Sequence, residues 1–310
     1  LAVFGTLQKL TRAEGLYFGI QPSPQTKFFS TFIYHNHWGA FTVLMLSMCL
    51  GLFFHFLRRH EGRDFMRSPA MLVATAASLL AISAPLSGSR SASIMTLLLL
   101  ISALAHWSFV TFRNRRKRQK SNLWPTICAV VLVGVFISTT YKLGKPIIQE
   151  RLLDTKFQLD NFKEGGVDDP RIILYRDTWA MASDRLLFGW GMASFPMVFY
   201  IYNSQQISPN DGLPNYYHDA HSDWLQSLAE LGLVGTALLG LCGLIPLWQL
   251  RKSLGCSPIS SYLIAASLLI LLYAWVEFPF GNTAVVIAFW ICFFTALSYG
   301  RIETSRSRSH

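Results

Sequence analysis

Seven apolar stretches, separated by polar segments, run along most of the chain. Each has close to the length, about 20 residues, that an α-helix needs to cross the hydrocarbon core of a bilayer. The stretches are 38–57, 69–86, 92–112, 124–141, 225–250, 259–276 and 284–299. This pattern predicts an all-α, polytopic membrane protein with about seven transmembrane helices in this chain.

Lysine and arginine gather in every second loop between these stretches. The basic loops are 58–67, 113–120, 251–252 and 301–308, and they alternate with 87–90, 142–223 and 277–283. Because positively charged loops stay on the cytoplasmic side, the second set is predicted to face outward. The long segment 142–223 is therefore predicted to be an outward-facing loop, and it is expected to carry short helices.

The chain has a formal net charge of +10, yet this surplus does not indicate a nucleic-acid partner. The basic residues lie in the predicted cytoplasmic loops, whereas the long outer loop holds most of the acids. Contact with anionic lipid explains the run at 113–120 better. Charged residues make up 14% of the chain and hydrophobic residues 52%, against about 25% charged residues in soluble domains. The lipid bilayer is the expected surrounding.

The cysteines and the first residue bear on the organisation of the chain. None of the five cysteines lies in the long outer loop, so the sequence shows no disulfide framework there, and no CxxC metal knuckle occurs.

The chain starts at Leu1 and not at Met, and no signal-peptide pattern precedes the first stretch. We therefore expect residues 1–310 to be a single integral-membrane domain that lacks N-terminal spans.

The outer loop contains a predicted short helix, a turn and an apolar segment. Residues 171–185 have helical spacing, and Pro170 favours a helix start there. One face of this helix is expected to carry Ile172, Tyr175, Trp179 and Ala182. The Gly-Trp-Gly sequence at 189–191 predicts a turn, and the aromatic segment 195–202 is suited to the membrane interface.

A polar, titratable cluster lies where the outer loop meets the fifth apolar stretch. His218, Asp219, His221 and Asp223 fall close together there. Asp219 is the expected N-cap, which places His221 in the first helical turn, where the helix dipole disfavours imidazolium. A neutral imidazole can accept a proton from a hydroxyl nucleophile. His221 is therefore the candidate catalytic residue, with His218, Asp223 and Glu277 as supporting candidates; a capping or interfacial histidine is the alternative.

Three arginines are candidates for holding an anion at the outer surface. Arg90 follows a loop of small polar residues, and Arg171 and Arg176 lie on the predicted loop helix. Arginine binds phosphate through two parallel hydrogen bonds and stays charged when partly desolvated, so the three can hold a pyrophosphate. The alternatives are that Arg90 snorkels to the interface and that the other two pair with loop acids such as Asp177.

Four histidines on the predicted outer side raise the alternative of a metal site. They are His35, His37, His218 and His221. Imidazoles suit zinc or copper, but HxH and HxxH are weak signals, and nothing in the sequence places the two pairs together. No residue is therefore assigned as a metal ligand.

Five segments, in order, resemble the bacterial O-antigen ligase-like family, which includes O-antigen ligases, O-antigen polymerases and protein O-oligosaccharyltransferases. They are FIYHNHWGAF at 32–41, SGSRSASI at 87–94, the Arg-bearing helix and glycine turn at 171–195, AHSDWLQSLAELGLVG at 220–235 and EFPFGN at 277–282. The chain departs from the family's usual pattern at Ser222, where Asn is common, and at Glu277, where Asp is usual. The resemblance therefore leaves the class of acceptor open.

What the resemblance implies is a metal-independent glycosyltransferase of the membrane-embedded C type, without a cofactor, in the synthesis of O-antigen, lipopolysaccharide or a related polysaccharide. Such an enzyme takes a glycan from a polyprenyl-pyrophosphate donor, typically undecaprenyl pyrophosphate, at the periplasmic face of the bacterial inner membrane. It transfers the glycan to a hydroxyl of a lipid A core, a protein or a growing polysaccharide. By motif, His221 is expected to be the base or to position the acceptor, and Arg90 and Arg176 to hold the pyrophosphate.

Two other functional classes stay open. A transporter or flippase of lipid-linked glycans would need charged residues inside the spans, and the predicted spans are almost free of charge. A metal-dependent membrane hydrolase would use the four histidines and would lose its activity when the metal is chelated.

Overall fold

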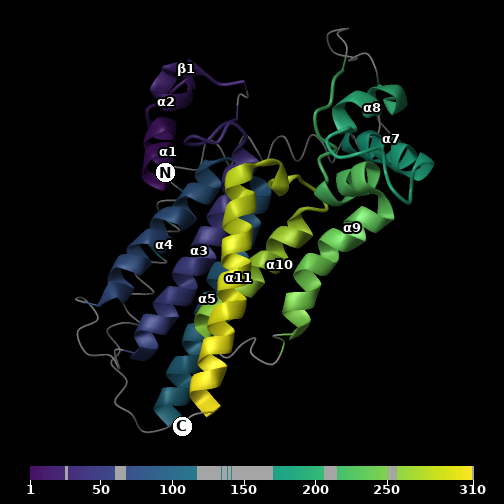
Figure 1. Ribbon diagram of the computed structural model, residues 1–310. Coiled ribbons are helices and arrows are strands. Elements are labelled where there is room, and N and C mark those ends of the chain that lie inside the picture. Colours follow the sequence, from purple (N-terminus) through teal and green to yellow (C-terminus); the bar gives the residue numbers. More distant parts are fainter. Residues whose placement is uncertain are drawn as a thin grey trace, which may run out of the picture. The chain divides into compact units, whose positions relative to one another are not determined.

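The computed structural model is helical and describes residues 1–24, 27–59, 68–116, 134, 138, 141, 170–205, 215–249, 251 and 257–308. Within these ranges the β-structure consists of the two-residue strand β1 (Gln21–Pro22) and three isolated bridges. The predicted all-α, polytopic fold is confirmed (Figure 1). The chain forms two compact units, which are described separately below. The grouping of residues 1–310 into a single domain remains a prediction.

Five helices of the described residues are long and apolar enough to cross a membrane. They are His35–Arg58, Pro69–Leu86, Arg90–Phe112, Asp223–Gln249 and Thr283–Ser305, and Pro258–Tyr273 is a shorter apolar helix. These six helices coincide with six of the seven predicted stretches. The predicted stretch 124–141 lies outside the described residues except at positions 134, 138 and 141. The orientation of the chain across the membrane remains a prediction.

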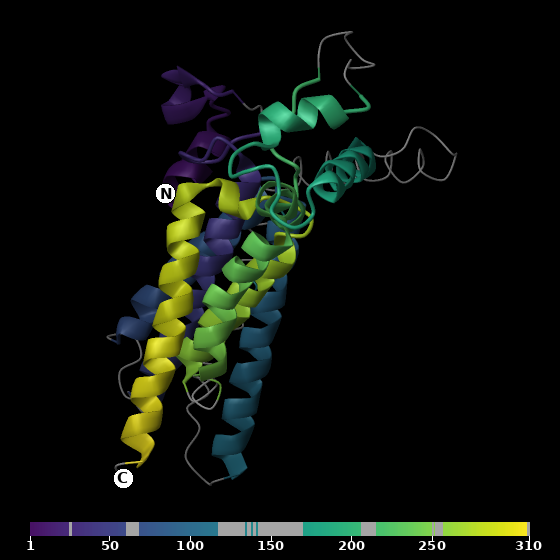
Figure 2. The same cartoon turned by 45° about the vertical axis from the view of Figure 1, so that its right-hand side comes forward.

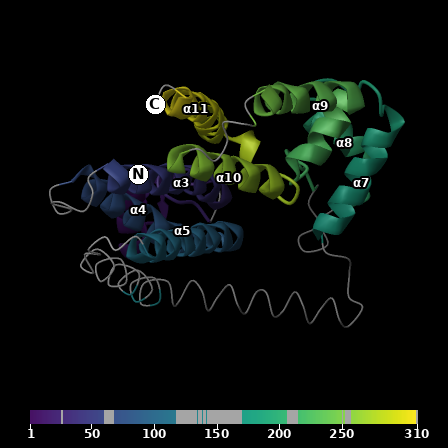
Figure 3. The same cartoon turned by 90° about the horizontal axis from the view of Figure 1, so that it is seen from below.

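The first unit comprises Leu1–Leu153, Ser253–Leu269 and Ile287–His310. Its described elements are α1 (Ala2–Leu10), α2 (Leu16–Gly19), β1, α3 (His35–Arg59), α4 (Pro69–Leu86), α5 (Arg90–Arg116), most of α10 (Pro258–Tyr273) and most of α11 (Thr283–Arg308). The helices α3, α4 and α5 pack against one another (Figure 3). Trp38 and Leu44 of α3 are fully buried, and the Ser47 hydroxyl donates a hydrogen bond to the Tyr262 carbonyl of α10.

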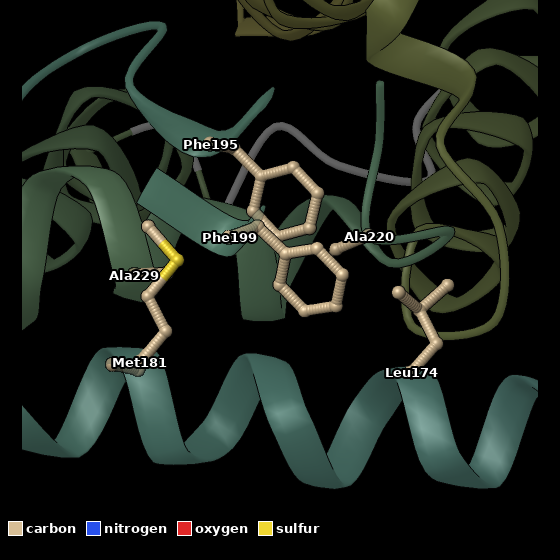
Figure 4. Close-up of a cluster of buried hydrophobic side chains, with 7 residues drawn as sticks. Leu174, Met181, Phe195, Phe199, Ala220 and Ala229 are labelled. Atoms are coloured by element: carbon tan, nitrogen blue, oxygen red, sulfur yellow. The ribbon is translucent and has the colours of Figure 1, made fainter. Parts of the chain in front are cut away.

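The second unit comprises Asp154–Lys252 and Ile270–Val286. Its described elements are α7 (Pro170–Asp184), α8 (Phe195–Tyr202), α9 (Asp223–Gln249) and the 3-10 turn η3 (Pro279–Gly281). The short helices α7 and α8 are the teal segments in Figure 2. The core of this unit is Leu174, Met181, Ala182, Phe195, Phe199, Ala220 and Ala229. Figure 4 shows Leu174 and Met181 pointing from α7 toward the rings of Phe195 and Phe199.

The buried face of α7 is centred on other residues than the face named from the sequence. Ile172 and Trp179 are exposed, whereas Leu174, Thr178 and Met181 are buried. Positions i, i+4 and i+7 share one face of a helix, and this second face is the one that packs on α8 and α9. The predicted helix is present, and of the four residues expected to share one face only Ala182 belongs to the buried core.

The fifth predicted span is interrupted at Gly232. This glycine has a φ of 66° and a ψ of −173°, which breaks α9. A Cβ atom there would lie 2.4 Å from the Leu187 carbonyl, so only glycine lets the two backbones approach. Leu233 N donates to Leu186 O at 2.8 Å and Val234 N donates to Leu187 O at 3.1 Å. The apolar helix after the break is 233–249, about 25 Å at 1.5 Å per residue.

Candidate functional site

His221 lies just before α9 and not inside it. The helix begins at Asp223, and the hydroxyl of Ser222 accepts a hydrogen bond from Leu225 N at 3.4 Å. The prediction that Asp219 caps the helix, with His221 in its first turn, is therefore wrong. The reason is that Ser222 also starts the helical ladder, since its carbonyl accepts from Gln226 N at 2.9 Å. His221 has a φ of 52°, a left-handed conformation that is uncommon for a residue other than glycine.

Glu277 is the partner of the His221 ring. His221 Nδ1 lies 3.7 Å from Glu277 Oε2, and Arg171 Nη2 lies 2.7 Å from Glu277 Oε1. The Glu277 side chain is only 4% exposed, whereas His221 is 30% and Arg171 46% exposed. Because Nδ1 itself is buried, the exposed part of the imidazole is its other side. One buried carboxylate therefore joins a histidine and an arginine, and the imidazole ring, which packs edge-on against Phe278 at 4.7 Å between centroids, stays partly exposed.

The charge of Glu277 is stabilised by these two neighbours. Burial alone raises the pKa of the Glu277 carboxyl, but the neighbouring His221 and Arg171 side chains outweigh it and hold the pKa below its usual value. A carboxylate next to an imidazole favours the tautomer with hydrogen on Nδ1, which leaves Nε2 as the nitrogen that can accept a proton. Glu277, which the sequence offered as a supporting candidate, thus lies in direct contact with the candidate base.

Several hydrogen bonds hold the His221 backbone against the segment that follows α10. The Tyr175 hydroxyl of α7 donates to the His221 carbonyl at 2.9 Å. Asp223 N donates to Glu277 O at 3.3 Å, and Phe280 N donates to the Asp223 carboxylate at 2.9 Å. Asp223 therefore fastens the two segments together. Tyr175, to which the sequence assigned only a place on a helix face, helps to position the candidate base.

The other polar residues of the predicted cluster surround this centre. The pKa of Asp219 is raised by burial, while the charges of His221 and His218 lower it in part. His218 is exposed, and its ring packs edge-on against Tyr216 at 4.8 Å between centroids. The structure thus places Asp219 in the electrostatic surroundings of both histidines and leaves His218 on the surface.

The three candidate arginines have different positions. Arg171 contacts Glu277, as described above. Arg176 is 63% exposed, and its Nε lies 3.6 Å from the carboxylate of the adjacent Asp177, which is the pairing that the sequence offered as an alternative. Arg90 is the first residue of α5, in the first unit, where Ser89 accepts a hydrogen bond from Ala92 N at 3.3 Å. Whether Arg90 and Arg176 meet a shared ligand remains a prediction.

The four histidines of the alternative metal site belong to different units. His35 and His37 lie at the start of α3, flanked by the ring of Tyr34, and His35 Nδ1 is 3.2 Å from Lys27 O. His218 and His221 belong to the second unit. Among the residues that the structure describes, no group of three or more histidine, cysteine or acidic side chains is placed to hold a metal ion.

Glu230 supports the site in a way that the sequence analysis missed. Its buried carboxylate accepts from Ala193 N at 3.0 Å and from Phe195 N at 3.1 Å. Gln226 Nε2 lies 3.3 Å from the same carboxylate, and Gln226 Oε1 accepts from Ala220 N at 3.0 Å. The sequence did offer one indication of this role, because Glu230 is a charged residue inside a predicted apolar span.

Comparison with known proteins identifies the family. The sequence model of the O-antigen ligase family matches residues 75–240, which is more than half of the chain and includes α7, α8 and His221. No curated protein and no solved structure matches the chain. The family match agrees with the resemblance carried by the five sequence segments and with the helical membrane fold. The chain therefore belongs to the O-antigen ligase family of membrane proteins.

Proposed function

We propose that this protein transfers a glycan from a polyprenyl-pyrophosphate donor to a hydroxyl acceptor at the periplasmic face of the bacterial inner membrane. Membership of the O-antigen ligase family assigns it to membrane enzymes of O-antigen processing. The observation that carries the finer proposal is the pair of contacts at Glu277. They give His221 a fixed orientation, a buried countercharge at Nδ1 and a partly exposed ring.

The proposed step is a displacement at the anomeric carbon of the donor glycan. The acceptor hydroxyl loses its proton to His221 Nε2 as its oxygen forms a bond with that carbon. The bond between the carbon and the pyrophosphate oxygen breaks, and the pyrophosphate leaves with the electron pair. Glu277 stabilises the imidazolium that forms, because a carboxylate at Nδ1 favours the charged ring. No metal ion or cofactor is needed for this balance of atoms and charge.

Arginine side chains would stabilise the charge that develops on the departing pyrophosphate. Arg176 has an exposed guanidinium, and we assign it to the leaving group together with Arg90. Arg171 is committed to Glu277 through Nη2, so its main proposed role is to position that carboxylate. Arg171 Nη1 also donates to Val276 O at 3.5 Å, and because the side chain is half-exposed we keep Arg171 as a further candidate for contact with the pyrophosphate.

The test is glycan transfer by the full-length protein in liposomes, with a polyprenyl-pyrophosphate donor and a chelator present. A general base contributes about 10²–10⁴-fold, so His221→Ala is expected to lower the rate by at least that order. Ser183→Ala is the control, since Ser183 is exposed on α7 of the same unit and has no assigned role, and it should transfer within a few fold of the intact protein.

Three other outcomes would change the interpretation. If His221→Ala transfers as fast as the intact protein, His221 is structural and the proposed chemistry is wrong. If transfer occurs only after zinc or another metal is restored, the hydrolase-like metal site gains support. If the intact protein moves the lipid-linked glycan across the bilayer without transferring it, the flippase alternative replaces the transferase.

A further inference from the structure

Five large apolar side chains in and just after the glycine turn of the second unit are exposed. They are Leu187, Phe188, Met192, Met197 and Ile201, each between 60% and 85% exposed. The sequence from 186 to 203 contains no charged residue. Single exposed apolar residues are ordinary on a protein surface, but a run of large ones indicates a partner. We call this set the Phe188 surface.

The Phe188 surface is fastened to the start of the apolar part of α9. The backbone bonds from Leu233 and Val234 to residues 186 and 187, described above, hold the turn at the Gly232 break. The helix that begins there is about 25 Å long, close to the thickness of a bilayer core. The surface therefore continues the lipid-facing side of a membrane helix, on which Leu233, Leu238 and Leu241 are also exposed.

Five backbone amides in and just after the turn donate hydrogen bonds to partners within the protein. Three of these amides donate to backbone carbonyls: Gly189 N to Arg185 O at 2.7 Å, Trp190 N to Ala229 O at 3.0 Å and Gly191 N to Glu230 O at 2.8 Å. The other two, Ala193 N and Phe195 N, donate to the Glu230 carboxylate at 3.0 and 3.1 Å. Non-helical backbone in contact with lipid requires such internal partners, because hydrocarbon offers none. A loop surrounded by water would not need a buried glutamate for this purpose.

Arginine and tryptophan pairs lie near both ends of the apolar part of α9. Arg185 lies 4.5 Å from the ring of Trp190, and Trp190 Nε1 donates to Met181 O at 2.8 Å. Toward the other end, Arg251 lies 4.1 Å from the ring of Trp248. Tryptophan is enriched at membrane interfaces, and arginine there can meet lipid phosphates. The first pair thus marks the level of the headgroups beside the Phe188 surface.

We propose that the Phe188 surface enters the outer edge of the hydrocarbon in the leaflet next to His221, with Arg185 and Trp190 among the phosphates of the headgroups. The occupant is bilayer lipid. This insertion would hold α7 and α8 at the membrane surface, where a lipid-linked substrate lies. The inference rests on the membrane character of α9 and not on the chemistry proposed for His221, so either can fail alone.

The test measures which solvent surrounds the turn. All cysteines are replaced by serine in the full-length protein, Phe188→Cys or Met192→Cys is introduced, and a nitroxide label is attached to the new cysteine before reconstitution in liposomes. Power saturation compares oxygen, which concentrates in hydrocarbon, with a nickel chelate, which stays in water. Ser183→Cys is the control, since Ser183 is exposed on α7 of the same unit. Both labels replace exposed side chains, so folding should be retained.

We expect labels at 188 and 192 to shift toward oxygen access relative to the label at 183. Equal access of the nickel chelate at 188 and 183 would overturn the proposal, because the turn would then lie in water. Protection of 188 from both reagents would also overturn it, because protein and not lipid would then cover the surface.

Discussion

Gly232→Ala tests whether α9 is broken where the structure places the break. The backbone conformation at Gly232, with φ at 66° and ψ at −173°, is one that residues other than glycine adopt at a cost of about 1–3 kcal/mol. The added Cβ would lie 2.4 Å from the carbon and oxygen of the Leu187 carbonyl. These are backbone atoms, so they cannot rotate away as a side chain would.

Relief of this overlap would separate the turn from α9. The two hydrogen bonds from Leu233 and Val234 would then be lost, at about 0.5–1.5 kcal/mol each. Together with the conformational cost, we expect a loss of about 2–6 kcal/mol in the free energy of unfolding. Since the whole stability of a domain is about 5–15 kcal/mol, the change should be large and should disturb the Ala193 and Phe195 contacts that support the site.

The assay is thermal unfolding of the purified protein in detergent, followed by glycan transfer in liposomes. Gly240→Ala is the matched control, because Gly240 lies in the same helix with open space where its Cβ would be. Alanine is favoured over glycine inside a helix by about 0.5–1 kcal/mol, so this variant should be unchanged or slightly more stable. If Gly232→Ala unfolds at the same temperature as Gly240→Ala, α9 is continuous and the argument for the break is refuted.

Two further substitutions test the carboxylates of the second unit. Glu277→Gln should cost about 1–2 kcal/mol at neutral pH, because it removes a charge-assisted hydrogen bond to a half-exposed arginine. The lowered pKa of Glu277 means that this contribution is present above the ordinary glutamate value of 4.5 and is lost as the pH falls through the folded-state pKa. The stability gap between intact protein and variant, followed by unfolding across pH, should therefore narrow in acid; a gap that widens would contradict the assignment. Glu230→Gln should lower the free energy of unfolding by about 1–3 kcal/mol, because it weakens the buried hydrogen bonds from two backbone amides. The control Glu303→Gln on α11, measured in the same unfolding assay, should change it by no more than about 0.5 kcal/mol. Equal losses in the two variants would show that the contacts of Glu230 do not stabilise the fold.

The membrane helices could be predicted because their signal is local. A run of about 20 apolar residues forms a helix in lipid almost regardless of its neighbours, since the backbone must satisfy its own hydrogen bonds. The break at Gly232 could not be predicted in this way. Glycine is common in ordinary transmembrane helices, and what breaks this one is a backbone more than forty positions earlier in the chain, at Leu186 and Leu187.

The candidate site could be predicted in its residues and not in its geometry. His221 stands in a dense group of titratable residues, and the sequence pattern pointed to that group. Asp219 and Ser222 are both good N-caps, so composition alone could not decide which one starts the helix. Glu277 comes much later in the sequence, and only the fold shows that it is the partner of His221 Nδ1. Tyr175 and Glu230 lie inside the segments 171–195 and 220–235 that carry the resemblance. Their hydrogen bonds to distant backbone atoms depend on the fold, so those segments alone could not reveal what the two side chains contact.

The break at Gly232 also explains how one segment can carry both a polar site and a membrane span. In a straight helix from Asp223, Glu230 would lie two turns along the axis, at the start of the hydrocarbon, where an unpaired carboxylate is costly. The break separates the polar piece 223–231 from the apolar piece 233–249, and it brings the amides of Ala193 and Phe195 to the Glu230 carboxylate. The same turn that satisfies this charge presents the Phe188 surface. A change that straightens α9 should therefore affect membrane contact and the site together, whereas loss of Phe188 alone should affect only membrane contact.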